Sequence, residues 1–104
     1  MDKIDTLRNF LKDNPHDNFL QHALALEYIK CGNDAEARVL FETILARDPE
    51  YIGSYYHLAK LLERIGETDK ALRIYETGMA ASKKAGDTHV YNELQAAFEN
   101  LNDE

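Results

Sequence analysis

Metal binding or nucleophilic catalysis would have to use the few residues here that suit such chemistry: Cys31, His16, His22, His57 and His89. A zinc site needs three or four such ligands converging on one point. No two of the histidines have the His-Glu-x-x-His spacing, and there is no Cys-x-x-Cys pair. The single cysteine has no obvious base beside it, so we expect a buried, unreactive thiol rather than a nucleophile.

Other kinds of enzyme chemistry also lack their usual signals. The sequence contains no Gly-x-Ser-x-Gly turn, no phosphate-binding loop of the Walker type and no Gly-x-Gly-x-x-Gly. A metal shared by His22, His57 and His89 would need a further ligand, such as Glu93, to converge with them. The sequence therefore predicts no catalytic residue, no metal and no cofactor, and the chain is not expected to be an enzyme.

The charge balance excludes two classes of partner. The chain of 104 residues has a formal charge of −7. Nucleic acids and anionic membrane surfaces are bound through clustered Lys and Arg, so neither is an expected partner. One cysteine allows no disulfide within the chain and favours a reducing compartment. The charged N-terminal stretch has no apolar signal-peptide core, and no apolar run could span a bilayer, so a cytoplasmic protein is expected.

Helices are predicted along most of the chain, because strong helix formers dominate and breakers are few. Apolar residues three and four apart predict helices at 2–13, 18–31, 34–47, 52–65, 68–84 and 88–101. Asn14-Pro15 and Asp48-Pro49 end two of them, and Gly32 and Gly66 end two more. The predicted N-caps are Asp17 or Asn18, Asn33 or Asp34, and Thr68 or Asp69.

A period of 34 residues relates the two middle helix pairs. The matching residues are Pro15 and Pro49, Leu24 and Leu58, Ala25 and Ala59, Gly32 and Gly66, Ala37 and Ala71, and Phe41 and Tyr75. This pattern resembles the tetratricopeptide repeat (TPR) family, whose unit is a 34-residue helix pair. The resemblance implies an all-α, right-handed α-solenoid of six helices in antiparallel hairpins, whose core comes from stacking.

The resemblance also divides the chain. It implies a single domain, 1–104, made of a half repeat (1–17), two repeats (18–51 and 52–85) and a C-terminal capping helix (86–104). Two positions depart from the family pattern: Gln21 stands where the second repeat has Tyr55, and Lys83 stands where a closing proline is expected. The last helix follows with a phase of 36 residues, which suggests that the helix before it runs longer.

In TPR proteins the first helices of the units line a concave groove, and the resemblance places candidate partner-binding residues there. A bound peptide or partner segment would use aromatic residues as apolar anchors and basic residues for acidic groups. The alternatives are a solvated face whose cations pair with Glu27 or Glu63, and a groove partly covered by the first helix. The candidates are Phe19, His22, Leu26, Ile29, Lys30, Tyr56, Lys60, Arg64, His89 and Asn92.

Two functional classes remain. Some TPR proteins clamp the C-terminal carboxylate of chaperones with Lys, Asn and Arg, but here His22, Leu26, His89 and Glu93 stand at those positions, so chaperone-tail binding is not predicted. The preferred function is a non-catalytic protein-interaction module. The alternative is self-association, for instance as a homodimer, in which Ile4 or Val90 at the ends is covered by a second copy.

Overall fold

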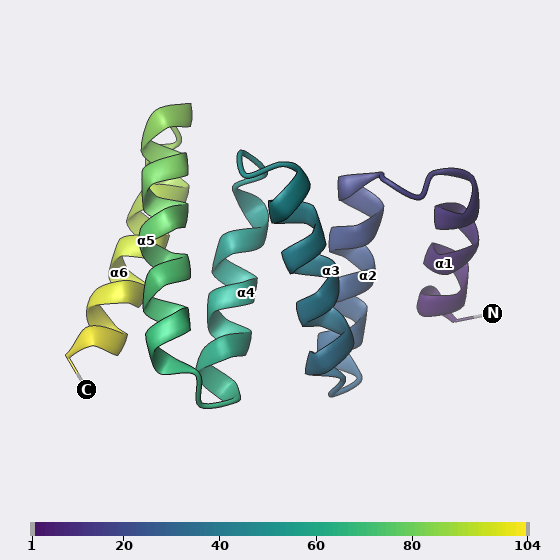
Figure 1. Ribbon diagram of the computed structural model, residues 1–104, viewed down its shortest axis with the longest axis horizontal. Coiled ribbons are helices and arrows are strands. Elements are labelled where there is room, and N and C mark those ends of the chain that lie inside the picture. Colours follow the sequence, from purple (N-terminus) through teal and green to yellow (C-terminus); the bar gives the residue numbers. More distant parts are fainter. Residues whose placement is uncertain (1, 104) are drawn as a thin grey trace. The chain divides into compact units, whose positions relative to one another are not determined.

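The computed structural model describes residues 2–103, which form six α-helices and no strand (Figure 1). The all-α fold is confirmed, and each helix end lies within one residue of the predicted range. No helix in the described part combines the length and the apolar character needed to cross a bilayer. The helices are α1 (Lys3–Asp13), α2 (Asn18–Lys30), α3 (Asp34–Arg47), α4 (Gly53–Arg64), α5 (Thr68–Ala85) and α6 (Thr88–Asn102).

The chain divides into two compact units, Met1–Arg47 and Asp48–Glu104. In the first unit, α2 is capped by the carboxylate of Asp17, which accepts from the N–H of Leu20 at 3.0 Å. α2 ends where Gly32 takes a positive φ of 76°, a conformation that suits a residue without Cβ. Asn33 then caps α3 through its side-chain oxygen, 3.3 Å from the N–H of Glu36. Both predicted caps are confirmed.

In the second unit, the α4–α5 turn repeats this geometry with one difference. Gly66 has a φ of 84°, and the N–H of Glu67 reaches the carbonyl of Leu62 at 2.9 Å. The residue after the glycine becomes the N-cap, as Asn33 does after Gly32, so the predicted cap at Thr68 or Asp69 is wrong. The longer Glu67 side chain makes no capping bond, and α5 starts without one.

Both hairpins bury the same positions. Seven pairs of residues related by the 34-residue period are buried in each copy, which makes the repeat visible in the packing as well as in the sequence. Periodic burial of this kind explains why apolar spacing located the helices correctly. The pairs are Gln21 and Tyr55, Leu24 and Leu58, Ala25 and Ala59, Tyr28 and Leu62, Ala37 and Ala71, Phe41 and Tyr75, and Ile44 and Gly78.

A side chain on each first helix bonds to the proline carbonyl six residues earlier. Gln21 donates from Nε2 to the carbonyl of Pro15 at 2.9 Å, and the Tyr55 hydroxyl donates to the carbonyl of Pro49 at 2.5 Å. The Gln21 amide oxygen also accepts from Arg47 at 2.9 Å. The departure at Gln21 therefore preserves the bond that the tyrosine makes in the second repeat.

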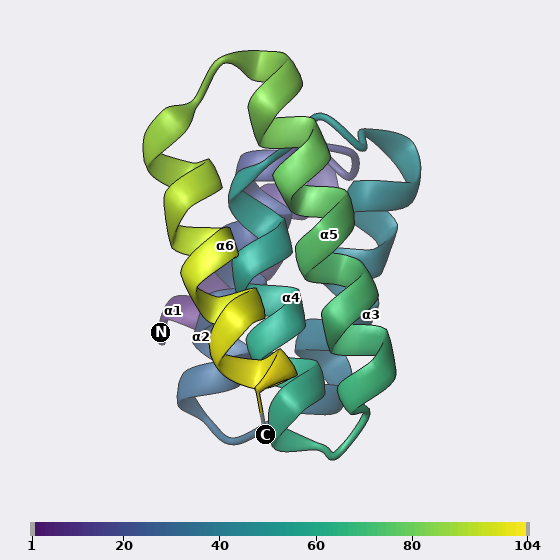
Figure 2. The same cartoon turned by 90° about the vertical axis from the view of Figure 1, so that its left-hand side faces the viewer.

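The absent proline lengthens α5. With Lys83 in place of a proline, α5 continues to Ala85 and has 18 residues, against 14 in α3. Gly86 then ends it, and the carboxylate of Asp87 caps α6 at the N–H of Val90, 3.0 Å away. Figure 2 shows α5 and α6 side by side and antiparallel. The longer helix accounts for the 36-residue phase of α6.

Candidate functional site

The five candidates on α2, in the first unit, are called the α2 face: Phe19, His22, Leu26, Ile29 and Lys30. Phe19 is 71% exposed, which is unusual for so large an apolar side chain. Leu26 and Ile29 are half-buried and keep part of their surface open. The face therefore offers apolar area along one side of α2.

Two polar residues of the α2 face already have neighbours. The ring of His22 meets the ring of Phe41 edge-on, with centroids 5.5 Å apart, so it contributes to the packing of α2 on α3. The Lys30 ammonium lies 3.0 Å from the carboxylate of Glu27 one turn away. The solvated ion pair considered from the sequence is present here, and such exposed pairs contribute little stability.

The candidates on α4, in the second unit, are called the α4 face: Tyr56, Lys60 and Arg64, spaced four residues apart. The Lys60 ammonium lies 5.7 Å from the centroid of the Tyr56 ring, within cation–π range. It also lies 3.5 Å from the carboxylate of Glu63. The cation is thus held between a ring and a carboxylate, and Tyr56 and Lys60 are both partly exposed.

A buried hydroxyl sits beneath the α4 face. Tyr75 on α5 is fully buried, and its hydroxyl donates a hydrogen bond to the Glu63 carboxylate. Burial and this negatively charged acceptor raise the pKa of Tyr75 well above its usual value. Glu63 therefore receives both a phenol and an ammonium, which fixes it on the helix. Sequence reasoning treated Tyr75 as scaffold, although the change from Phe41 to Tyr75 between repeats signals a hydroxyl in need of a partner.

His57 connects α4 with α6 electrostatically. Burial lowers the pKa of His57, the charge of Glu93 on α6 acts in the opposite direction, and Arg64 lowers the pKa further. Its ring also meets the Tyr56 ring edge-on, with centroids 5.7 Å apart. The Glu93 carboxylate thus faces the same helix that carries Tyr56 and Lys60.

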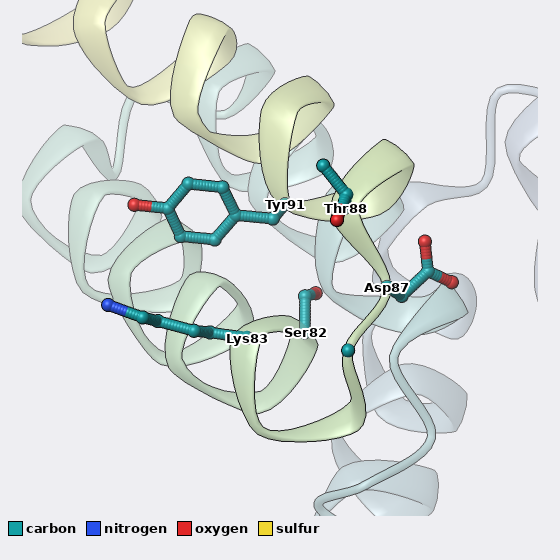
Figure 3. Close-up of a pocket in the computed structure, with 6 residues that line it drawn as sticks. Ser82, Lys83, Asp87, Thr88 and Tyr91 are labelled. Atoms are coloured by element: carbon teal, nitrogen blue, oxygen red, sulfur yellow. The ribbon is translucent and has the colours of Figure 1, made fainter.

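The α6 candidates, His89 and Asn92, are both exposed. Neither lines the hollow of about 220 Å³ at the α5–α6 turn, whose α6 residues are Thr88 and Tyr91. Figure 3 shows Lys83 on α5 and Tyr91 on α6 extending in the same direction along this hollow, with Ser82 between the two helices. The Ser82 hydroxyl donates to the carbonyl of Gly78 at 2.8 Å, so it is already engaged within α5.

Cys31 is exposed, so the expectation of a buried thiol is wrong. It is the C-cap of α2, directly before the left-handed Gly32, where the chain turns away from the core. Within residues 2–103, no three His, Cys, Asp or Glu side chains are grouped so that they could hold a metal ion.

Comparison with known proteins identifies the family. A family model described as tetratricopeptide repeat matches residues 28–98. The solution structure of a tetratricopeptide repeat domain protein from Salinibacter ruber is 40% identical, with a TM-score of 0.80 over 84% of this chain and 88% of that one. The chain belongs to the tetratricopeptide repeat family, as the 34-residue period predicts.

More distant proteins share the fold. The TPR2B domain of yeast Sti1, solved as a pHsp70 complex, is 15% identical with a TM-score of 0.88 over 96% of this chain and 80% of that one. Mouse interferon-induced protein with tetratricopeptide repeats 3 is 21% identical over 94% of this chain. The chain spans only 24% of that curated relative, about a quarter of its length.

Proposed function

We propose that the chain is a non-catalytic protein-interaction module that binds a segment of another protein on the first helices of its repeats. The binding residues of this proposal are the α2 face, the α4 face, and His89 and Asn92 on α6. The repeat boundaries 18–51 and 52–85 and a cytoplasmic location belong to the same proposal. Its basis is membership of a family of interaction modules together with the composition of these faces.

One observation carries the proposal: a partly exposed Tyr56 ring with the Lys60 ammonium held over it. Aromatic residues are enriched at protein interfaces because a ring offers a large contact area at low entropic cost. A cation positioned by Glu63 costs less entropy to engage than a freely rotating lysine. The α4 face thus suits a segment that presents an apolar side chain next to an acidic group.

The comparison with yeast Sti1 supports a peptide ligand but not the same ligand. That structure is a pHsp70 complex. In this chain His22, Leu26 and His89 stand at positions where the carboxylate clamp of such proteins requires Lys or Asn, so a chaperone tail is not the proposed partner. The expected ligand is an internal segment rather than a free C-terminus.

Selection from an unbiased peptide-display library, followed by anisotropy titration of the enriched peptides, tests the proposal. Tyr56→Ala and Lys60→Glu should each weaken binding by about tenfold. The matched controls are Val39→Ala, an exposed apolar residue on α3, and Lys70→Glu, a cation paired with Glu67 on α5. Unchanged affinity in both test variants would rule out the α4 face as the binding surface.

A further inference from the structure

In the first repeat, an arginine side chain joins the end of α3 to the start of α2. The guanidinium of Arg47, the last residue of α3, donates to the side-chain oxygen of Asn18 at 2.5 Å and to that of Gln21 at 2.9 Å. The period of 34 residues places Ala81 of α5 in line with this arginine. The second repeat therefore has no guanidinium of its own at this position.

In the second repeat, a hollow of about 270 Å³ lies between α4 and α5, and it is called the α4–α5 pocket. It includes Ala81 and Tyr55, the residues that correspond to Arg47 and Gln21. Alanine ends at Cβ, so the second repeat leaves open, beside the tyrosine, a space that a long side chain spans in the first. The wall of the pocket is formed by Pro49, Tyr55, Thr77, Ala80 and Ala81.

The remaining wall residues of the α4–α5 pocket are the same in both repeats. The identical pairs are Pro15 and Pro49, Thr43 and Thr77, and Ala46 and Ala80. In each repeat the threonine hydroxyl donates to the carbonyl four residues earlier, at 2.7 Å in α3 and at 2.9 Å in α5. Both repeats thus surround this space in a similar way, and the first one fills it with its own arginine.

Negative charge gathers at the α4–α5 pocket. Glu50 lines it, at the position where the first repeat has His16. Burial raises the pKa of Tyr55, and the nearby negative charge of Asp48 raises it further. The Tyr55 hydroxyl donates to the carbonyl of Pro49 and keeps a lone pair that can accept. A guanidinium would therefore meet hydrogen-bond acceptors here, and the formal charge of −7 on the chain attracts basic segments.

One cation of the chain also lines the α4–α5 pocket. The Lys84 ammonium lies 3.6 Å from the Glu50 carboxylate, with side chains that are 79% and 73% exposed. An ion pair so exposed to water contributes little stability. A guanidinium can bond to a carboxylate through two parallel N–H groups, which an ammonium cannot do. Lys84 therefore lowers the affinity for an arriving cation without closing the pocket.

We propose that the α4–α5 pocket receives an arginine side chain from a segment of a partner protein. The aliphatic part of the arginine lies along Ala80 and Ala81, and its guanidinium bonds to the Glu50 carboxylate. The ligand is thus a basic segment, whereas the α4 face suits an acidic one. The pocket shares no residue with the α4 face, so this site goes beyond the proposed function and does not depend on it.

An NMR titration of the isotope-labelled chain with a short capped peptide, acetyl-Gly-Ser-Arg-Ser-Gly-amide, tests the proposal. The amide signals of Tyr55, Ala80 and Ala81 should shift and reach saturation. The same peptide with citrulline in place of arginine keeps the shape but loses the charge, and it should bind about tenfold more weakly. The absence of saturable shifts, equal binding of both peptides, or shifts confined to the α4 face would overturn the proposal.

The two charged residues of the pocket should act in opposite directions on the affinity for the arginine peptide. Glu50→Gln removes the acceptor charge and should weaken binding by about fivefold, whereas Lys84→Gln removes a competing cation and should strengthen it by about twofold. Glu99→Gln is the matched control, because it removes the same charge from an exposed residue of α6 outside the pocket. All three side chains are exposed, so circular dichroism should show intact helices. Unchanged binding to Glu50→Gln would contradict the assigned place of the guanidinium.

Ala81→Arg gives the second repeat the residue that the first repeat has. The new side chain should occupy the α4–α5 pocket and weaken binding of the arginine peptide by about tenfold or more, and arginine suits a helix nearly as well as alanine does. Ala96→Arg is the matched control, since it adds the same side chain at an exposed position of α6. Tyr56→Ala should leave binding of this peptide unchanged, which separates the pocket from the α4 face. Wild-type affinity in Ala81→Arg would overturn the proposal.

Discussion

The hairpins α2–α3 and α4–α5 bury the same repeat positions, but they fill one pair of these positions with side chains of different size. In the first repeat Gln21 and Ile44 occupy two positions that Tyr55 and Gly78 occupy in the second. Where the first-helix side chain is large, the second helix has no side chain at all. Where it is smaller, the second helix carries a branched aliphatic group. Side-chain volume therefore moves from one helix of the hairpin to the other, while the first-helix side chain still donates its hydrogen bond to the proline carbonyl.

A second exchange changes the chemistry of the surface. Phe41 and Ile29 of the first repeat correspond to Tyr75 and Glu63 of the second. The buried hydroxyl of Tyr75 needs an acceptor, and Glu63 supplies it. Glu63, beside the α4 face, is therefore charged where Ile29 of the α2 face is apolar, because the buried Tyr75 hydroxyl takes an acceptor that Phe41 does not need. A difference between two buried residues can therefore go together with a difference in charge on the first helix of the repeat.

The largest expected effect comes from filling the space at Gly78. Gly78→Ala would place a Cβ 2.7 Å from the Tyr55 Cβ and 3.0 Å from a Leu94 methyl, so the helices must move apart. The clash should outweigh the gain in helix propensity and cost about 2 kcal/mol in urea unfolding. Gly53→Ala is the control, since nothing lies within 4 Å of that position, and it should not destabilise. Equal stability of the two variants would contradict the proposed volume exchange.

The contributions of Tyr75 and Glu63 to the free energy of unfolding should depend on each other. Glu63→Ile alone leaves the buried Tyr75 hydroxyl without its acceptor and should cost about 1.5 kcal/mol. Adding Tyr75→Phe reproduces the pair found in the first repeat, and the double variant should recover about 1 kcal/mol of that loss. Stability from urea unfolding, combined in a double-mutant cycle, measures the coupling. If the costs of Glu63→Ile and Tyr75→Phe were strictly additive, the two residues would not be coupled, and the comparison with Phe41 and Ile29 would fail.

Loss of the proline bond should have a smaller effect. Tyr55→Phe keeps the ring in place but removes the hydroxyl that donates to the Pro49 carbonyl, so it should cost about 1 kcal/mol. Native-state hydrogen exchange should show the loss in α4 and α5. Tyr91→Phe, on a half-buried ring of α6, is the control, and comparable losses in both would mean that the bond contributes little.

The smallest expected effect is a pH dependence carried by His57, whose counterpart in the first repeat is Ala23. The folded-state pKa of His57 lies below that of the unfolded chain, because burial disfavours the charged form. The unfolded state therefore binds the proton first, and stability should fall as the pH drops below about 6.5. His57→Gln should reduce this dependence of the free energy of unfolding on pH, as measured by urea unfolding.

Substitution of Glu93 tests the direction in which its carboxylate shifts the pKa of His57. Glu93 raises the His57 pKa against the effect of burial, so Glu93→Gln should lower that pKa further and steepen the loss of stability at low pH. A weaker dependence of the free energy of unfolding on pH in Glu93→Gln would contradict the role of the Glu93 charge in raising the pKa of His57.

The helices, their limits and the core could be predicted because they depend on local rules. Apolar spacing, prolines and glycines act within a few residues of themselves, and the caps at Asp17 and Asn33 followed from their side chains alone. The bond from Tyr75 to Glu63 joins two helices, and the sequence does not show which hydroxyl meets which carboxylate. The exposure of Cys31 likewise depends on where the chain leaves the core, and the binding residues stay predictions.

The bond from each first helix to a proline carbonyl also bears on how the chain could be lengthened. If residues 18–51 were duplicated in tandem, the inserted Gln21 would follow Pro49 by six residues, the same interval that now separates Gln21 from Pro15. The inserted segment would therefore bring its own donor and find an acceptor already in place. The carbonyl of the proline is the same acceptor in both repeats, so a segment duplicated at this point would keep this hydrogen bond where it joins the chain.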